Sequence, residues 1–234
     1  MKFFSYESKF SQLLLKLGFA CYLNLLWFIC SIPIFTVGAA TTALYYTSLK
    51  IVRDEEYRVG RLFFRSFKQN FRQSTVVWLI MLGIGLFLGT DAYILNHLRL
   101  STTGTPAVIW TLILTVVIAA SLMYVIVLLY LFPLIASVEN TNKAMFKNAF
   151  LIGTHYLFAT IMLFAIRFAM FFIVVAWFTP MIVFGEGLCV LISAWMLDRL
   201  LISVSGTPQD PKDEPQDSEE ESSDSEEESE EDDL

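Results

Sequence analysis

The chain has 234 residues, of which 56% are apolar, and carries a formal net charge of −7. Apolar stretches of about 20 residues follow one another along most of its length, and each is long enough to cross the ~30 Å hydrocarbon core of a bilayer as a helix. This composition leaves little room for a soluble domain and predicts an all-α, polytopic membrane protein with no nucleic-acid partner.

The negative charge is concentrated at the C-terminal end. Fifteen of the 23 acidic residues lie between Asp210 and Asp233, and the remaining chain has 15 Lys and Arg against 8 Asp and Glu. The end is rich in Ser, Asp and Glu and has no aromatic residue, which is the composition of a disordered segment. We therefore predict a helical membrane domain at 1–204 and a disordered acidic tail at 205–234.

The first 54 residues contain either one membrane segment or two. Their apolar run is interrupted by Pro33, which stops or kinks a helix. This break predicts a segment at 10–32 and a shorter one at 37–53, whose small residues suit a tightly packed position inside a bundle. A hairpin at Pro33 gives six membrane segments in total, and a single crossing gives five.

Loop charge favours the six-segment alternative. The loop after residue 53 is strongly basic, which is a cytoplasmic signature. The hairpin places Lys2, Lys9 and Lys16 on the same side as this loop, whereas a single crossing places them outside. We expect a multi-pass protein of the cell membrane with both termini cytoplasmic. The other four segments are predicted at 75–95, 107–136, 156–178 and 181–203.

An amphipathic cytoplasmic helix is predicted at 57–72, between the second and third segments. Its cations recur at spacings of three and four residues and form one stripe, with aromatic rings beside it. The stripe and rings comprise Arg58, Arg61, Arg65, Lys68 and Arg72 with Phe63, Phe67 and Phe71. Such an elbow either lies on the membrane, with rings toward acyl chains and cations toward anionic headgroups, or docks a cytoplasmic partner. The acidic tail is either a solubilising brush or a shield over this stripe.

Three runs of sequence carry a family resemblance. Residues 33–46 (PIFTVGAATTALYY) are followed by 49–56 (LKIVRDEE) and 63–71 (FFRSFKQNF). Together they resemble the YesL-like family of bacterial membrane proteins, specifically over 10–80 and diffusely to about 203. The family's activity is undefined. The resemblance implies an association with carbohydrate uptake, with membrane transporter subunits as candidate partners, and it implies no catalytic residue.

Enzyme signatures are missing from the sequence. It contains no phosphate-binding Gly-rich loop, no His-Glu-x-x-His and no Cys-x-x-Cys. The three cysteines, Cys21, Cys30 and Cys189, lie in apolar runs without paired spacing and are interpreted as small buried apolar residues. We therefore expect no catalytic residue, cofactor or metal site.

Ionisable residues inside apolar segments are better candidates for a functional site, because a charge at that depth costs at least ~2.5–3.5 kcal/mol. Arg167 lies near the centre of segment 156–178. Glu186 and Asp91 lie toward the outer ends of their own segments, and each is a candidate partner for it. The pattern fits a polar pocket that opens outward for a substrate or ion, and it also fits a structural ion pair that joins helices.

Two function classes follow. The first is an accessory or regulatory membrane protein that binds another protein, with carbohydrate uptake as the context that the resemblance implies. The second is a small transporter or channel with a polar site around Arg167. A continuous polar path through the helices favours transport, whereas a sealed apolar core favours the accessory role.

Overall fold

The computed structural model describes residues 9–53, 58–138, 140–176 and 182–205. Within these ranges the chain forms α-helices and one 3-10 turn and no strand, so the all-α class is confirmed. The helices are α1 (Lys9–Ser31), η1 (Ile34–Thr36), α2 (Val37–Val52), α3 (Val59–Ser101), α4 (Thr105–Ser137), α5 (Asn142–His155), α6 (Leu157–Ala176) and α7 (Ile182–Ser205). The acidic tail predicted at 205–234 lies almost entirely outside the described residues.

The predicted break at Pro33 is present. Helix α1 ends at Ser31, and the chain passes through η1 before α2 begins at Val37. The Thr36 hydroxyl lies 2.6 Å from the carbonyl oxygen of Cys30, to which it donates a hydrogen bond. That carbonyl is near the end of α1, where backbone oxygens lack helical partners. The side chain of Thr36 therefore stabilises the turn that Pro33 imposes.

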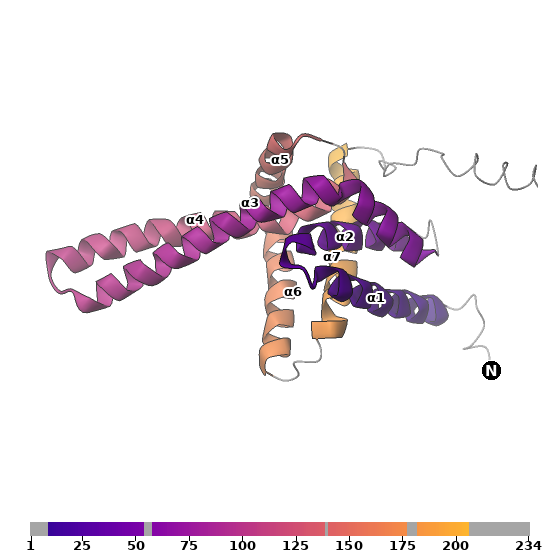
Figure 1. The fold of residues 1–234 in the computed structure, drawn as a ribbon, viewed down its shortest axis with the longest axis horizontal. Helices are drawn as coiled ribbons and strands as arrows, with labels where there is room; N and C mark the ends of the chain where they lie inside the picture. The colour runs from indigo at the N-terminus through magenta and orange to yellow at the C-terminus, as the bar shows by residue number, and fades with distance from the viewer. Residues whose placement is uncertain (1–8, 54–57, 139, 177–181, 206–234) are drawn as a thin grey trace, which may run out of the picture.

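Helix α2 lies at the centre of the body, between α1 and α3 (Figure 1). Thirteen of its 16 residues are buried. A Cβ atom at Gly38 would lie 2.5 Å from the Cβ of Trp78 and 2.6 Å from the carbonyl oxygen of Ser74. Because only glycine permits this approach of α3, the tight packing predicted from the small residues of this segment is confirmed.

The prediction of a separate amphipathic helix at 57–72 is wrong. These residues and the predicted segment 75–95 belong to one continuous helix, α3, of 43 residues. No Gly or Pro lies between 61 and 82, so nothing local stops the helix. The helix ends at Ser101, close to Gly104, whose φ of +77° glycine adopts without steric cost. Gly104 thus permits the turn into α4.

Helices α3 and α4 form a long hairpin that projects from the body, and α6 and α7 run across its direction (Figure 1). Both hairpin helices are long and apolar enough to cross a membrane. Helices α5 and α6 meet at a bend of 98° and make a third candidate if they are taken together as one broken span. The described part of the chain therefore contains two to three membrane-capable helices.

Candidate functional site

Arg167 joins three helices. Its Nη1 atom forms an ion pair with Oε1 of Glu186 on α7, and its Nη2 atom donates a 2.8 Å hydrogen bond to the hydroxyl of Tyr45 on α2. The side chains of Arg167 and Glu186 are 26% and 23% exposed, so both are largely removed from solvent. Pairing offsets much of the cost of placing the guanidinium in an apolar helix.

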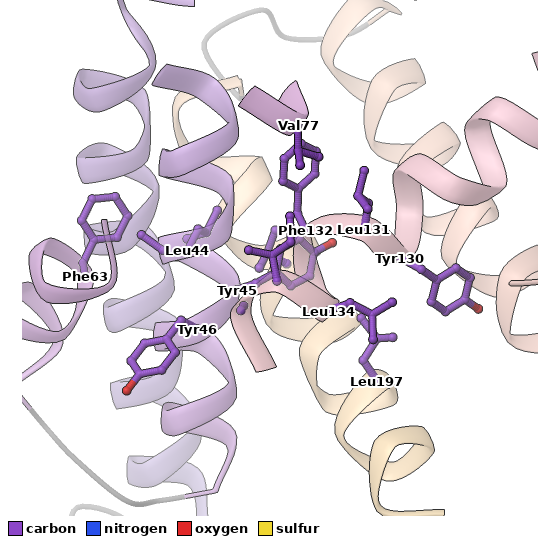
Figure 2. Close-up of a cluster of buried hydrophobic side chains, with 14 of the residues drawn as sticks. Leu44, Tyr45, Tyr46, Phe63, Val77, Tyr130, Leu131, Phe132, Leu134 and Leu197 are labelled. Carbon is purple, nitrogen blue, oxygen red and sulfur yellow. The ribbon is translucent and has the colours of Figure 1, made fainter. Parts of the chain in front are cut away.

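The structure separates the two acidic residues that the sequence offered as partners. Glu186 contacts Arg167, whereas Asp91 lies on the distal part of α3, in the hairpin that projects from the body (Figure 1). Asp91 therefore does not contribute to the site around Arg167. Tyr45, which sequence reasoning missed, takes part in its place. Figure 2 shows Tyr45 among the buried side chains that α2, α3 and α4 contribute to the core.

A pocket of about 370 Å³ opens beside this ion pair. Residues from six helices line it: Trp27, Val37, Thr41, Tyr45, Trp78, Val125, Leu128, Leu129, Phe132, Phe164, Arg167 and Glu186. Its volume is within the range of about 300–1,000 Å³ typical of small-molecule sites, which combine apolar walls with a few polar groups. The charged groups of the lining are one cation and one anion in contact, so the pocket suits an uncharged ligand best.

Hydrogen bonds hold the aromatic walls of this pocket. The indole nitrogen of Trp27 donates to the Thr41 hydroxyl at 3.1 Å, and that of Trp78 donates to the carbonyl oxygen of Ile34 at 2.8 Å. The rings of Trp78 and Phe132 lie with centroids 6.1 Å apart, in the range of favourable aromatic pairs. The pocket is therefore built from fixed side chains that already have partners.

A second ion pair joins α7 to the end of α2. Nε of Arg53 lies 2.7 Å from Oδ1 of Asp198, and the two side chains are 12% and 13% exposed. Asp198 was not among the site residues predicted from the sequence. The signal was available, because an acidic residue in segment 181–203 carries the same burial cost as Arg167 does in its segment. Helix α7 is thus bonded to α6 through Glu186 and to the C-terminal end of α2 through Asp198.

The basic stripe occupies the first turns of α3. Arg58, Arg61, Lys68 and Arg72 are exposed, and Arg65 is half-buried. The stripe is therefore the main accessible cationic feature of α3.

Within the described residues, no group of His, Cys, Asp and Glu is arranged to hold a metal ion.

Two rings of the elbow, those of Phe63 and Phe67, pack on the protein core, whereas the membrane alternative predicted them toward acyl chains. Phe63 is fully buried in the core, and Phe67 packs against the same core. Phe63 and Phe67 are stacked with ring centroids 6.3 Å apart, and Phe71 lies 5.5 Å from Phe67. The prediction failed for Phe63 because this part of α3 packs on α2. The aromatic ring of Phe63 therefore contacts other side chains of the same protein and not lipid. This packing holds the helix in place while its cations face outward.

The all-helical architecture, with two to three helices long and apolar enough to cross a membrane, defines the class as a helical, membrane-type protein. Residues 20–92 match the family model described as "Protein of unknown function, DUF624". Over 136 residues, 56% of this chain, the sequence is 26% identical to "Uncharacterized protein YesL" of Bacillus subtilis (strain 168), and the match spans 60% of that relative. No solved structure matches the chain. The two matches confirm the resemblance to the YesL-like family, a family of unknown function.

Proposed function

We propose that this chain is an accessory or regulatory protein of the cell membrane that binds another membrane protein and catalyses no reaction. The observation that supports this role best is the pairing of charges inside the body. Arg167 bonds Glu186 and Tyr45, and Arg53 bonds Asp198. The other walls of the pocket are mainly apolar, so the polar groups around Arg167 do not continue through its lining as a path for solutes.

The basic stripe of α3 is the proposed docking surface. Its exposed cations lie on a helix whose opposite face is fixed in the core through Phe63, so a partner meets a preformed surface. The complementary surface is anionic: lipid headgroups, an acidic face of a partner, or both. The resemblance to the YesL-like family suggests a transporter subunit of a carbohydrate-uptake system as the protein partner.

The proposed topology has six segments with both termini cytoplasmic. Its support is the loop charge, which places the N-terminal lysines and the basic stripe on one side. For all six segments to cross one bilayer, the α3–α4 hairpin has to align with α6 and α7, which cross its direction in Figure 1.

Capture from native membranes tests the accessory role. The tagged chain is solubilised in a mild detergent and its companions are identified by mass spectrometry. We expect a membrane subunit of a solute transporter to copurify in near-stoichiometric amount. Recovery of the chain alone, together with solute flux in liposomes that contain only this chain, would contradict the proposal.

A small transporter or channel is the second candidate, and the pocket beside Arg167 is the observation that favours it. In this alternative an uncharged solute occupies the pocket and bonds to the Arg167–Glu186 pair. Flux through liposomes that is abolished by Phe164→Trp, which puts a larger side chain in the lining of the pocket, would favour transport. The same substitution should leave the stripe unchanged, because Phe164 lies on α6 and no cation of the stripe lines its pocket.

A further inference from the structure

Helix α7, which precedes the acidic tail, is bonded to the end of α2, which precedes the basic stripe of α3. The 2.7 Å ion pair between Arg53 and Asp198 fixes α7 beside the end of α2. Asp198 precedes the end of α7 at Ser205 by seven residues, or about 10 Å of helix. Arg53 precedes Arg58, the first cation of the stripe, by five residues, which span at most about 18 Å. The end of α7 and the first cation of the stripe are therefore at most roughly 40 Å apart.

The two segments are complementary in charge. The tail carries 15 carboxylates between Asp210 and Asp233, and the stripe presents four exposed cations and the half-buried Arg65. Three acidic residues at 54–56 precede the stripe, but the five cations outnumber them. The stripe extends over 15 residues, or about 21 Å of helix, whereas the 24 residues of the tail reach up to about 80 Å. Length therefore does not prevent the tail from lying along the whole stripe.

We propose that residues 210–233 bind the basic stripe of α3 in their own chain and cover it. Each exposed ion pair is weak and screened by salt, so the contact depends on many pairs at once and exchanges readily. A tethered segment nevertheless competes well, because its local concentration at the stripe is high. The tail is thus an intramolecular competitor of any anionic partner. This regulatory consequence rests on the proposed docking role, whereas the contact itself does not.

Carbodiimide cross-linking of the purified full-length chain tests the contact without any partner present. The reagent joins lysine amines to neighbouring carboxylates, and peptide mass spectrometry identifies the linked residues. Lys68 reports on the stripe, and the exposed lysines Lys143 and Lys147 of α5 are matched controls. Acetylation by a small reagent corrects each yield for the intrinsic reactivity of that lysine.

We expect Lys68 to link to tail carboxylates at least fivefold more than Lys143 or Lys147. The excess should disappear in 1 M NaCl and in the variant Arg61→Gln/Arg72→Gln, which retains Lys68. A mixture of ¹⁵N-labelled and unlabelled chains should give links within one isotope type. Equal yields at the three lysines, an excess that survives the double substitution, or links mainly between chains would overturn the inference. Because no partner is present, none of these outcomes depends on the capture experiment.

Discussion

Removing one member of the Arg167–Glu186 pair should cost more stability than removing both. Glu186→Leu leaves the guanidinium largely buried with Tyr45 as its remaining partner among the described residues, and Arg167→Leu leaves the carboxylate of Glu186 uncompensated. Breaking a buried pair in this way typically costs about 3–5 kcal/mol. Since the two side chains are 26% and 23% exposed, we expect a smaller loss, about 2–3 kcal/mol for each single variant.

The corresponding change in melting temperature is measurable in detergent. For a chain of this size, 1 kcal/mol shifts Tm by about 2–4 °C, so each single variant should melt roughly 4–12 °C below the parent. The double variant should recover more than half of the summed loss and so melt above either single variant, because it leaves no unpaired charge. The cycle is followed by the intrinsic fluorescence of the five tryptophans.

Asp91→Leu is the matched control for this cycle. Asp91 lies on the projecting hairpin, so its substitution should be additive with Arg167→Leu. Additive losses in the Glu186 cycle would refute the reasoning, since they would show that Arg167 and Glu186 do not stabilise each other. Coupling with Asp91 in place of Glu186 would refute it as well.

Three further predictions concern other parts of the chain. Asp198→Asn should lower Tm by roughly 2–8 °C, because it removes the ion pair with Arg53. The expected loss of stability is about 1–2 kcal/mol, since the amide that remains can still accept a hydrogen bond. An unchanged Tm would contradict the pairing. Gly38→Ala should lower the stability of the protein by about 1–3 kcal/mol in the same melt, because the added Cβ would overlap atoms of α3. Gly83→Ala is the control: its added Cβ would have no neighbour within 4 Å, so it should be neutral or stabilising. A cysteine at Ser5 should resist a membrane-impermeant maleimide in intact cells and react after lysis, and labelling in intact cells would favour five spans.

Features with a local cause were predictable from the sequence. Pro33 ends a helix through its own ring, and the small residues of 37–53 permit close packing wherever that segment lies. The continuity of α3 had a local cause too, the absence of a helix-stopping residue after Arg72. The change from an amphipathic to an apolar pattern at that point was interpreted as a boundary between helices, although it marks only a change of environment along one helix.

The partners of buried groups were not predictable, because they depend on how helices pack. Burial cost identified Arg167 and Glu186 as unusual residues but could not distinguish Glu186 from Asp91. Phe63 lies on an amphipathic face, and the sequence does not indicate whether such a face contacts lipid or protein. Tyr45 carries no charge and so gave no signal until α2 was placed beside α6 and α7.

The docking role of the basic stripe is the central claim, and a comparison of two charge-matched variants tests it most directly. Arg61→Gln/Lys68→Gln removes two exposed cations from the stripe, and Lys143→Gln/Lys147→Gln removes two from α5. Both tagged chains are captured from native membranes at equal expression, and the copurifying transporter subunit is quantified by mass spectrometry. We predict that the stripe variant recovers at least fivefold less of that subunit than the parent, while the α5 variant recovers the parental amount. Equal recovery with both variants would contradict the claim.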